Sequence, residues 1–313
     1  MPGDTEGVIR PASARPSWVL RPAEGGAVEG PGSFDELLGL VRAGEVAVLT
    51  GAGLSTESGI PDYRGPDGTR RVMPMQYDEF SGSSAARQRY WARSFIGWQR
   101  FTRAHPNAGH RAVTALQRSG RLTGIVTQNV DGLHQEAGAH DVLELHGTLD
   151  RVVCLTCGDR SSRVALHERM ALANPGFADR VLAVAGDASR VTSQIRPDGD
   201  IVLDDDLVTT FHLQACLVCG RDTLKPDVVF FGESVPKETV AHAFDTVDRA
   251  RGLLVLGSSL AVMSGYRFVR RAHRDGKPVA IVTAGPSRGD GEATIRLHGP
   301  LGETLTRLAA AVA

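Results

Sequence analysis

The 313-residue sequence lacks the features that would place the protein in a membrane or a secretory pathway. No segment approaches the roughly 18 apolar residues that a membrane-spanning helix needs, and the N-terminal segment has no apolar stretch like that of a secretion signal. The formal net charge is −1, so the chain has no bulk positive field to hold a nucleic-acid backbone or an anionic membrane. We therefore expect a cytoplasmic protein that binds neither membrane nor nucleic acid. The sequence leaves the oligomeric state open, with a monomer as the simplest case.

Cysteine is also scarce, and the four cysteines form two CxxC pairs separated by residues 158–215. Four thiolates in this arrangement predict a closed tetrahedral zinc site, which is structural because it leaves no position for a water molecule. Disulfides are one alternative, but they form mainly in oxidising compartments. A zinc ribbon that binds nucleic acid is another, although few basic or aromatic residues surround the second pair. The predicted zinc ligands are Cys154, Cys157, Cys216 and Cys219.

Composition divides the chain into a short arm and one folded domain. Residues 1–32 are rich in Pro, Gly and Ala and show little periodicity, which predicts a flexible N-terminal arm. The main domain spans residues 33–313 and begins with the capping-box spacing of Ser33 and Glu36, which predicts a first helix. Residues 151–225 carry both cysteine pairs and interrupt the alternation of strands and helices. They predict a smaller inserted zinc-binding module.

The main domain alternates short apolar runs with helical patterns. Each run leads into a loop rich in Gly, Ser or Asn, and the runs lie at 46–49, 124–127, 228–231, 253–256 and 279–283. The helical patterns between them lie at 107–119, 240–251 and 266–274. Runs that are apolar throughout indicate strands buried on both faces. We therefore predict an α/β fold with a doubly wound, Rossmann-like parallel sheet, in which ligands bind beyond the carboxyl ends of the strands.

The first apolar run leads into a glycine turn, Gly51-Ala52-Gly53. Such a turn lets backbone N–H groups approach phosphate oxygens without a side chain between them, although an ordinary tight turn has the same pattern. The dehydrogenase fingerprint has a third glycine where Thr56 stands, and a second strand ending in an acidic residue about 20 residues further on. The residues after Thr56 are too rich in Gly and Pro for that unit. A dinucleotide held in the manner of dehydrogenases is therefore not expected.

The glycine turn continues into a longer motif that resembles the NAD-binding signature of the sirtuin family, over residues 51–64 (GAGLSTESGIPDYR). Further segments resemble family motifs in the family's order: 127–134, 144–147, 225–233 and 257–260. The resemblance covers residues 33–313, which are then the catalytic domain. Residues 89–93 and 264–268 are similar to the class II branch of the family.

This resemblance implies an NAD-dependent protein lysine deacylase. Sirtuins cleave the nicotinamide–ribose bond of NAD and transfer the acyl group of an acyl-lysine to ADP-ribose, releasing nicotinamide. NAD is then the co-substrate, one zinc ion is structural, and the partners are acylated-lysine proteins or peptides. A protein mono-ADP-ribosyltransferase uses the same cleavage and is the first alternative. A catalytically silent NAD-sensing or zinc-ribbon interaction protein is the second.

The resemblance also assigns the chemistry to particular residues. His146 matches the family's catalytic histidine, and a side chain that titrates near pH ~6.5 suits a base acting on a ribose hydroxyl near neutrality. By resemblance, Asn129 and Asp131 serve the nicotinamide pocket and catalysis, and Gln128 serves the ribose. Thr283 stands where relatives usually carry Asn. The predicted cofactor-binding residues are Gly51, Ala52, Gly53, Ser55, Thr56, Ile60, Asp62, Tyr63, Arg64, Gln128, Asn129, Val130, Asp131, Gly257, Ser258, Ser259, Thr283, Ala284, Gly285 and Leu301.

Two further segments resemble substrate-binding parts of the family. Residues Phe231, Gly232 and Glu233 resemble the segment that pairs with the substrate backbone around the acyl-lysine, a mode that gives affinity with little sequence preference. Tyr90 and Arg93 lie three positions apart, so on a helix they share a face. They resemble the pair with which desuccinylating sirtuins hold an acidic acyl tail. The alternative is that Arg93 belongs to a solvated arginine face.

Overall fold

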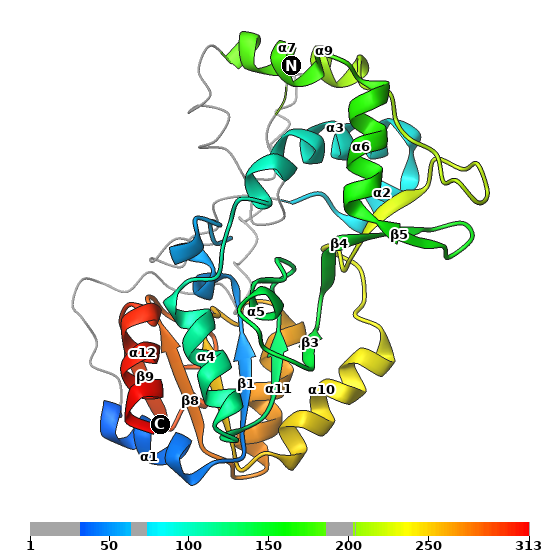
Figure 1. Cartoon of the computed structure of the whole chain (residues 1–313). Helices are drawn as coiled ribbons and strands as arrows, with labels where there is room; N and C mark the ends of the chain where they lie inside the picture. Colours follow the sequence, from blue (N-terminus) through cyan, green and yellow to red (C-terminus); the bar gives the residue numbers. More distant parts are fainter. Residues whose placement is uncertain (1–31, 64–73, 186–202, 204, 313) are drawn as a thin grey trace, which may run out of the picture.

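The computed structural model describes residues 32–63, 74–185, 203 and 205–312 (Figure 1). The predicted N-terminal arm and Arg64 therefore lie outside the described residues, apart from Gly32. The capping box predicted at Ser33 is present, since the Ser33 hydroxyl accepts from the Glu36 amide and the Glu36 carboxylate accepts from the Ser33 amide. The helix that it starts, α1, spans Phe34–Ala43. No helix in the described part of the chain is both long and apolar enough to cross a membrane.

Six parallel strands form the main sheet, in the order β3-β2-β1-β7-β8-β9. Strands β1, β7 and β8 are buried along their whole length, which is why they appear in the sequence as continuous apolar runs. The α/β prediction is confirmed, and four of the five predicted strand runs lie in this sheet. The strands are β1 (Val46–Thr50), β2 (Leu122–Thr127), β3 (Val142–Glu144), β7 (Gly252–Leu256), β8 (Val279–Thr283) and β9 (Ile295–His298).

Helices cover both faces of the main sheet, so the fold is doubly wound (Figure 1). Helices α1, α4 (Ala108–Arg118) and α12 (Leu301–Val312) form one core with β1, β7 and β8. Helices α10 (Lys237–Arg249) and α11 (Met263–Arg274) form a second core on the opposite face. Alternate residues of β1 divide between the two cores, Val46 and Val48 in one and Ala47 and Leu49 in the other. This division is the period-two alternation of a strand buried on both sides.

The fifth predicted run, residues 228–231, is not a strand of the parallel sheet. The chain forms β6 (Leu224–Val228) there, which pairs antiparallel with β4 (Gly147–Cys154) in a separate three-stranded sheet ordered β5-β4-β6. The prediction was wrong because a run of four apolar residues does not say which sheet it joins. Strand β5 spans Arg160–Ser162.

The smaller module around this second sheet has its own core, which includes helices distant in the sequence. Helices α2 (Tyr77–Gly82) and α3 (Ser84–Phe101) contribute Phe80, Trp91 and Phe95 to the same hydrophobic cluster as Leu166 and Phe177. Figure 1 shows α3 beside α6 at the end of the molecule away from the main sheet. The module therefore draws on residues both inside and outside 151–225. Its remaining helices are α6 (Arg163–Ala173), α7 (Phe177–Ala185) and α9 (Asp205–Thr209).

Strands β4 and β6 connect the cysteine module to the main domain. The ladder pairs Cys154 with Leu224 at one end and Gly147 with Val228 at the other. Gly147 has a left-handed φ of 78°, and a Cβ placed on it would lie 2.0 Å from the carbonyl oxygen of Asp227. Only glycine fits such a close approach of two backbones. The ladder therefore ends one residue after His146.

Candidate active site

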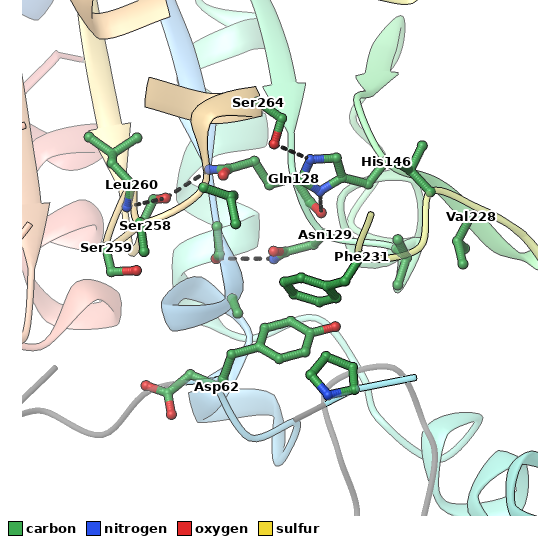
Figure 2. Close-up of a pocket in the computed structure, with 18 of the residues that line it drawn as sticks. Asp62, Gln128, Asn129, His146, Val228, Phe231, Ser258, Ser259, Leu260 and Ser264 are labelled. Atoms are coloured by element: carbon green, nitrogen blue, oxygen red, sulfur yellow. Dashed lines mark hydrogen bonds between the residues drawn. The ribbon is translucent and has the colours of Figure 1, made fainter. Parts of the chain in front are cut away.

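The loops at the carboxyl ends of β1, β2, β7 and β8 surround a cavity of about 800 Å³. Its other wall comes from residues 228–235 and from Tyr90 of α3, so the cavity lies between the main sheet and the smaller module. Figure 2 shows the polar side chains of this cavity, which include Gln128, Asn129, His146 and Ser258. The cavity is where ligands are expected in an open parallel sheet.

The glycine turn after β1 fits closely against the loop after β7. The Gly51 amide donates to the carbonyl oxygen of Leu256 at 2.9 Å, and the Gly53 amide donates to that of Gly257 at 2.8 Å. A Cβ on Gly53 would lie 2.8 Å from the same Gly257 oxygen. Both of these amides therefore join the two loops. The residues still line the cavity, together with Ala52.

A chain of hydrogen bonds links the β1 loop to the β2 loop. The Asn129 side-chain amide donates to the carbonyl oxygen of Gly51 at 3.1 Å and to the Ser55 hydroxyl at 3.0 Å. The Ser55 hydroxyl in turn donates to the Asp131 carboxylate at 2.6 Å, and that carboxylate also accepts from the amide of Leu133 at 3.0 Å. Burial raises the pKa of Asp131, and the hydrogen bond from Ser55 opposes that rise. These bonds fix the positions of the Asn129 and Asp131 side chains in the cavity wall.

Gln128 and Ser258 connect the next two loops. The Gln128 amide donates to the Ser258 hydroxyl at 2.8 Å and to the carbonyl oxygen of Thr50 at 3.2 Å. The Ser258 oxygen also accepts from the Leu260 amide at 3.2 Å. A Cβ on Gly265 would lie 2.4 Å from the Gln128 amide oxygen, so the first turn of α11 packs directly on this side chain. The floor of the cavity is thus rigidly cross-linked between β1, β2 and β7.

His146 follows β3 and reaches the cavity between the loop after β2 and helix α11 (Figure 2). Its Nδ1 lies 2.8 Å from the carbonyl oxygen of Gln128, and its Nε2 lies 2.8 Å from the Ser264 hydroxyl. Burial lowers the pKa of His146; the bond to the Gln128 carbonyl opposes this, and the positive charge of Arg267 lowers the pKa further. At neutral pH the imidazole is therefore neutral, as a base must be.

Most of the predicted cofactor residues line the cavity, Thr56 and Leu301 do not, and one is not described. Arg64 lies outside the described residues. Thr56 is exposed, and its hydroxyl donates to the carbonyl oxygen of Gly53 at 2.9 Å, so it supports the loop from outside. Leu301 is buried behind Gly257, where its Cδ1 would lie 2.9 Å from an added Cβ. The lining cofactor residues are Gly51, Ala52, Gly53, Ser55, Ile60, Asp62, Tyr63, Gln128, Asn129, Val130, Asp131, Gly257, Ser258, Ser259, Thr283, Ala284 and Gly285.

The predicted substrate segment lines the opposite wall. The Phe231 ring packs edge-on against Tyr63, with centroids 5.6 Å apart. Glu233 also lines the cavity, but its carboxylate accepts from the Phe230 amide at 2.8 Å and from the buried Lys225 ammonium at 3.1 Å. Glu233 therefore holds the shape of the segment. Tyr90 lines the cavity, whereas Arg93 is not among the lining residues.

Besides Met263, the first turns of α11 place Ser264 and Arg267 in the cavity wall, and neither of these two was among the predicted site residues. Both lie in the segment 264–268 that resembles the class II branch, but nothing local to that segment indicates that it faces His146. Their spacing of three on a helix was the available signal, since it places both side chains on one face.

The four cysteines meet at the end of the smaller module. Their sulfur atoms all lie within 4.8 Å of one another, with 3.6 Å between Cys154 and Cys219 and 3.8 Å between Cys157 and Cys216. Tetrahedral zinc–thiolate bonds of about 2.3 Å place neighbouring sulfurs about 3.8 Å apart, so the cluster fits zinc. Each CxxC turn closes alike, with the Gly158 amide donating to the Cys154 carbonyl and the Gly220 amide to that of Cys216.

Comparison with known proteins agrees with this fold and site. A family model described as the Sir2 family matches residues 51–264, and the chain belongs to that family. NAD-dependent protein deacetylase 1 of Streptomyces coelicolor is 54% identical over 282 residues, covering 89% of this chain and 90% of the relative. Human NAD-dependent protein lipoamidase sirtuin-4 is 44% identical over 262 residues, covering 82% of this chain and 80% of the relative. A solved complex of a Sir2 homologue with NAD has a TM-score of 0.67 at 26% identity, covering 90% of this chain and 95% of that chain.

Proposed function

We infer that the protein is an NAD-dependent protein lysine deacylase with one structural zinc ion. The observation that carries this conclusion is a half-buried, neutral His146 that opens onto the same cavity as the Asn129 and Asp131 pocket, in a Sir2-family chain. NAD supplies the ribose that accepts the acyl group, with nicotinamide as the leaving group. Acyl-lysine, NAD and water give lysine, nicotinamide and acyl-ADP-ribose.

His146 is the proposed base for a ribose hydroxyl. Its Nδ1 proton is held by the Gln128 carbonyl, which leaves the Nε2 lone pair to accept a proton. The lowered pKa of His146 keeps Nε2 unprotonated at neutral pH. A histidine with an ordinary pKa would already be partly protonated there, so burial of the ring favours the base form.

Asn129, Asp131 and Ser55 form the proposed nicotinamide pocket. Their mutual hydrogen bonds hold three polar side chains in place before any ligand arrives, so little ordering remains to be done on binding. The Sir2-family chain has solved neighbours described as a complex with p53 peptide and NAD⁺ and as a complex with a myristoylated histone peptide. We propose that acylated-lysine proteins or peptides bind along residues 228–233 in this chain.

The acyl chain is the finer part of the proposal. Tyr90 forms part of the cavity wall, and Arg93 lies one helical turn further along α3 with its Nε buried and without a hydrogen-bond partner among the described residues. An unpaired guanidinium nitrogen gains from an acidic partner, because an unsatisfied buried donor costs free energy. We therefore propose that Arg93 favours acidic acyl groups over acetyl when a long acyl chain reaches past Tyr90.

The test is to incubate the purified protein with NAD and one peptide carrying acetyl-, succinyl-, glutaryl- or lipoyl-lysine, and to weigh the products. Free lysine peptide together with nicotinamide and acyl-ADP-ribose supports deacylation. A protein or peptide that gains the mass of ADP-ribose, without loss of its acyl group, would replace the proposal with mono-ADP-ribosylation. Absence of NAD consumption with every peptide would leave the silent NAD-sensing alternative.

We also propose that the protein is cytoplasmic and monomeric and that it does not bind nucleic acid. A net charge of −1 supports the last part, since phosphate contacts need clustered positive charge. Light scattering after size-exclusion chromatography tests the monomer, and a gel-shift assay at 50 mM salt tests nucleic-acid binding. Fractionation of the source cells tests the location.

A further inference from the structure

The hydrogen bonds of His146 determine which of its two ring nitrogens carries the proton. A carbonyl oxygen only accepts, so the contact of 2.8 Å between Nδ1 and the Gln128 carbonyl requires a proton on Nδ1. In the neutral ring Nε2 is then an acceptor. The Ser264 hydroxyl, 2.8 Å away, therefore donates to the same lone pair that the proposed base would use (Figure 2).

The surroundings of Ser264 favour this direction of donation. Ser264 is the second residue of α11, where the positive end of the helix dipole lies. Arg267 is three positions further along the same helix, and its Nε donates to the carbonyl oxygen of Met263 at 3.3 Å, next to Ser264. A hydroxyl beside positive charge turns its oxygen toward that charge and its hydrogen away. This favours the Ser264 hydroxyl as the donor and Nε2 of His146 as the acceptor.

We propose that Ser264 is a positioning residue for His146: in the free enzyme its hydroxyl occupies the Nε2 lone pair and orients the ring, and a ribose hydroxyl of NAD replaces it on binding. This inference rests on the proposed function, because it assumes that His146 acts as the base on a ribose hydroxyl. Ser264 lines the cavity and is half-buried, so a ligand can reach the bond. No proton is transferred in the exchange, since one hydroxyl donor replaces another.

The exchange has a consequence that separates it from a merely structural role. A donor to the neutral Nε2 favours the neutral ring, so Ser264 lowers the pKa of His146 only while the bond exists. The charged or titratable groups that line the cavity around His146 are Asp62, Tyr63, Tyr90, Asp131, Glu233, Lys237 and Arg267. All of these groups are still present in Ser264→Ala, so they do not explain a change in the pKa of His146 that occurs only in that variant.

The primary test is an NMR pH titration of His146 in wild type and Ser264→Ala, without NAD and with saturating NAD. In the free protein, the pKa of His146 should rise by roughly 0.4 to 1 unit in Ser264→Ala, the size expected for one neutral hydrogen bond. Ser264→Thr should restore the wild-type value because it retains the hydroxyl. With NAD bound, the wild type and Ser264→Ala should titrate together.

Activity gives an independent second readout. The acid limb of the pH profile of kcat/KM reports the pKa of the base in the free enzyme. The acid limb of the kcat profile reports its pKa in the enzyme–substrate complex. Ser264→Ala should therefore move the acid limb of kcat/KM to higher pH and leave the acid limb of kcat unchanged. Ser119→Ala, an exposed serine at the end of α4, is the matched control and should move neither.

Two results would overturn the proposal. An unchanged His146 pKa in free Ser264→Ala means that the hydroxyl does not occupy Nε2, and a difference that persists with NAD means that it is not replaced. Equal zinc content and melting curves establish that the variant is folded. If Ser264→Ala does not fold, Ser264→Cys serves instead, because a thiol is a weaker donor. Lack of deacylation by wild type would refute the proposed function, while the titration of the free protein would still test the hydrogen bond.

Discussion

Acid should destabilise the protein through two histidines buried under the active-site loops. His110 on α4 and His134 on α5 (Leu133–Glu136) are 0% and 1% exposed, with ring centroids 5.1 Å apart. The Nε2 atom of His134 lies 3.0 Å from the Thr50 hydroxyl, while Nε2 of His110 and Nδ1 of His134 have no hydrogen-bond partner within the described ranges. No carboxylate pairs with either ring there, so protonation of either one leaves a buried positive charge.

The pKa values give the size of the effect. Burial, with smaller contributions from His134 and Arg111, lowers the pKa of His110 from 6.5 to about 3, and burial lowers that of His134 from 6.5 to about 4. When the pKa of a group is lower in the folded state than in the unfolded state, the group is a source of folding stability at any pH above its unfolded-state pKa. This stability is lost as the pH falls toward the folded-state pKa. The stability that His110 contributes is therefore lost as the pH falls from about 6.5 to about 3. At pH 5 each histidine costs about 2 kcal/mol relative to pH 7.5, and the pair about 4 kcal/mol.

Urea unfolding of wild type and His134→Gln at pH 7.5 and pH 5 measures this loss. Between the two pH values, His134→Gln should lose about 2 kcal/mol less unfolding free energy than wild type, because one of the two buried rings is gone. His105→Gln is the matched control, because the His105 side chain is 77% exposed, and its pH-dependent loss should equal that of wild type. If His134→Gln loses as much stability as wild type between the two pH values, the buried pair is not the source of acid sensitivity.

Three further predictions concern the site and the metal. His146→Ala should keep its fold and lose roughly 10² to 10⁴ of deacylation rate, with nicotinamide exchange affected less; near-normal turnover would refute the base assignment. Zinc removal by a chelator, or Cys154→Ser, should lower the melting temperature and abolish activity, whereas full activity of demonstrably metal-free protein would contradict a structural role. Arg93→Met should erase a roughly ten- to hundredfold preference in kcat/KM for succinyl- or glutaryl-lysine over acetyl-lysine, and equal ratios in both proteins would mean that Arg93 does not recognise the acyl chain.

Features that depend on residues close in the sequence could be predicted well. The capping box of Ser33 and Glu36 is a local pattern, and the buried strands β1, β7 and β8 are continuous apolar runs. The cysteine cluster was predictable because two CxxC pairs are a common ligand pattern of structural zinc. The motif residues of the site were found by resemblance, and their roles stay predictions.

Features that depend on distant contacts could not be predicted. Residues 224–228 pair with β4 rather than with the main sheet, and α3 joins the cysteine module across the intervening strands. The amides of Gly51 and Gly53 bind β7 and its loop, residues that lie far along the chain. Likewise, Arg93 shares a helix with Tyr90 yet does not line the cavity. Each outcome is decided by the packing of a second segment, which local periodicity does not contain.

Strands β4 and β6 connect the four cysteines to the backbone of the catalytic histidine. Cys154 pairs near Leu224 at the metal end, and the Val229 amide donates to the His146 carbonyl at 2.8 Å at the other. We expect loss of zinc to loosen both strands at the cysteine end, and the same strands hold the His146 backbone at their other end. Catalysis is then expected to depend on zinc, although the four cysteines lie outside the cavity.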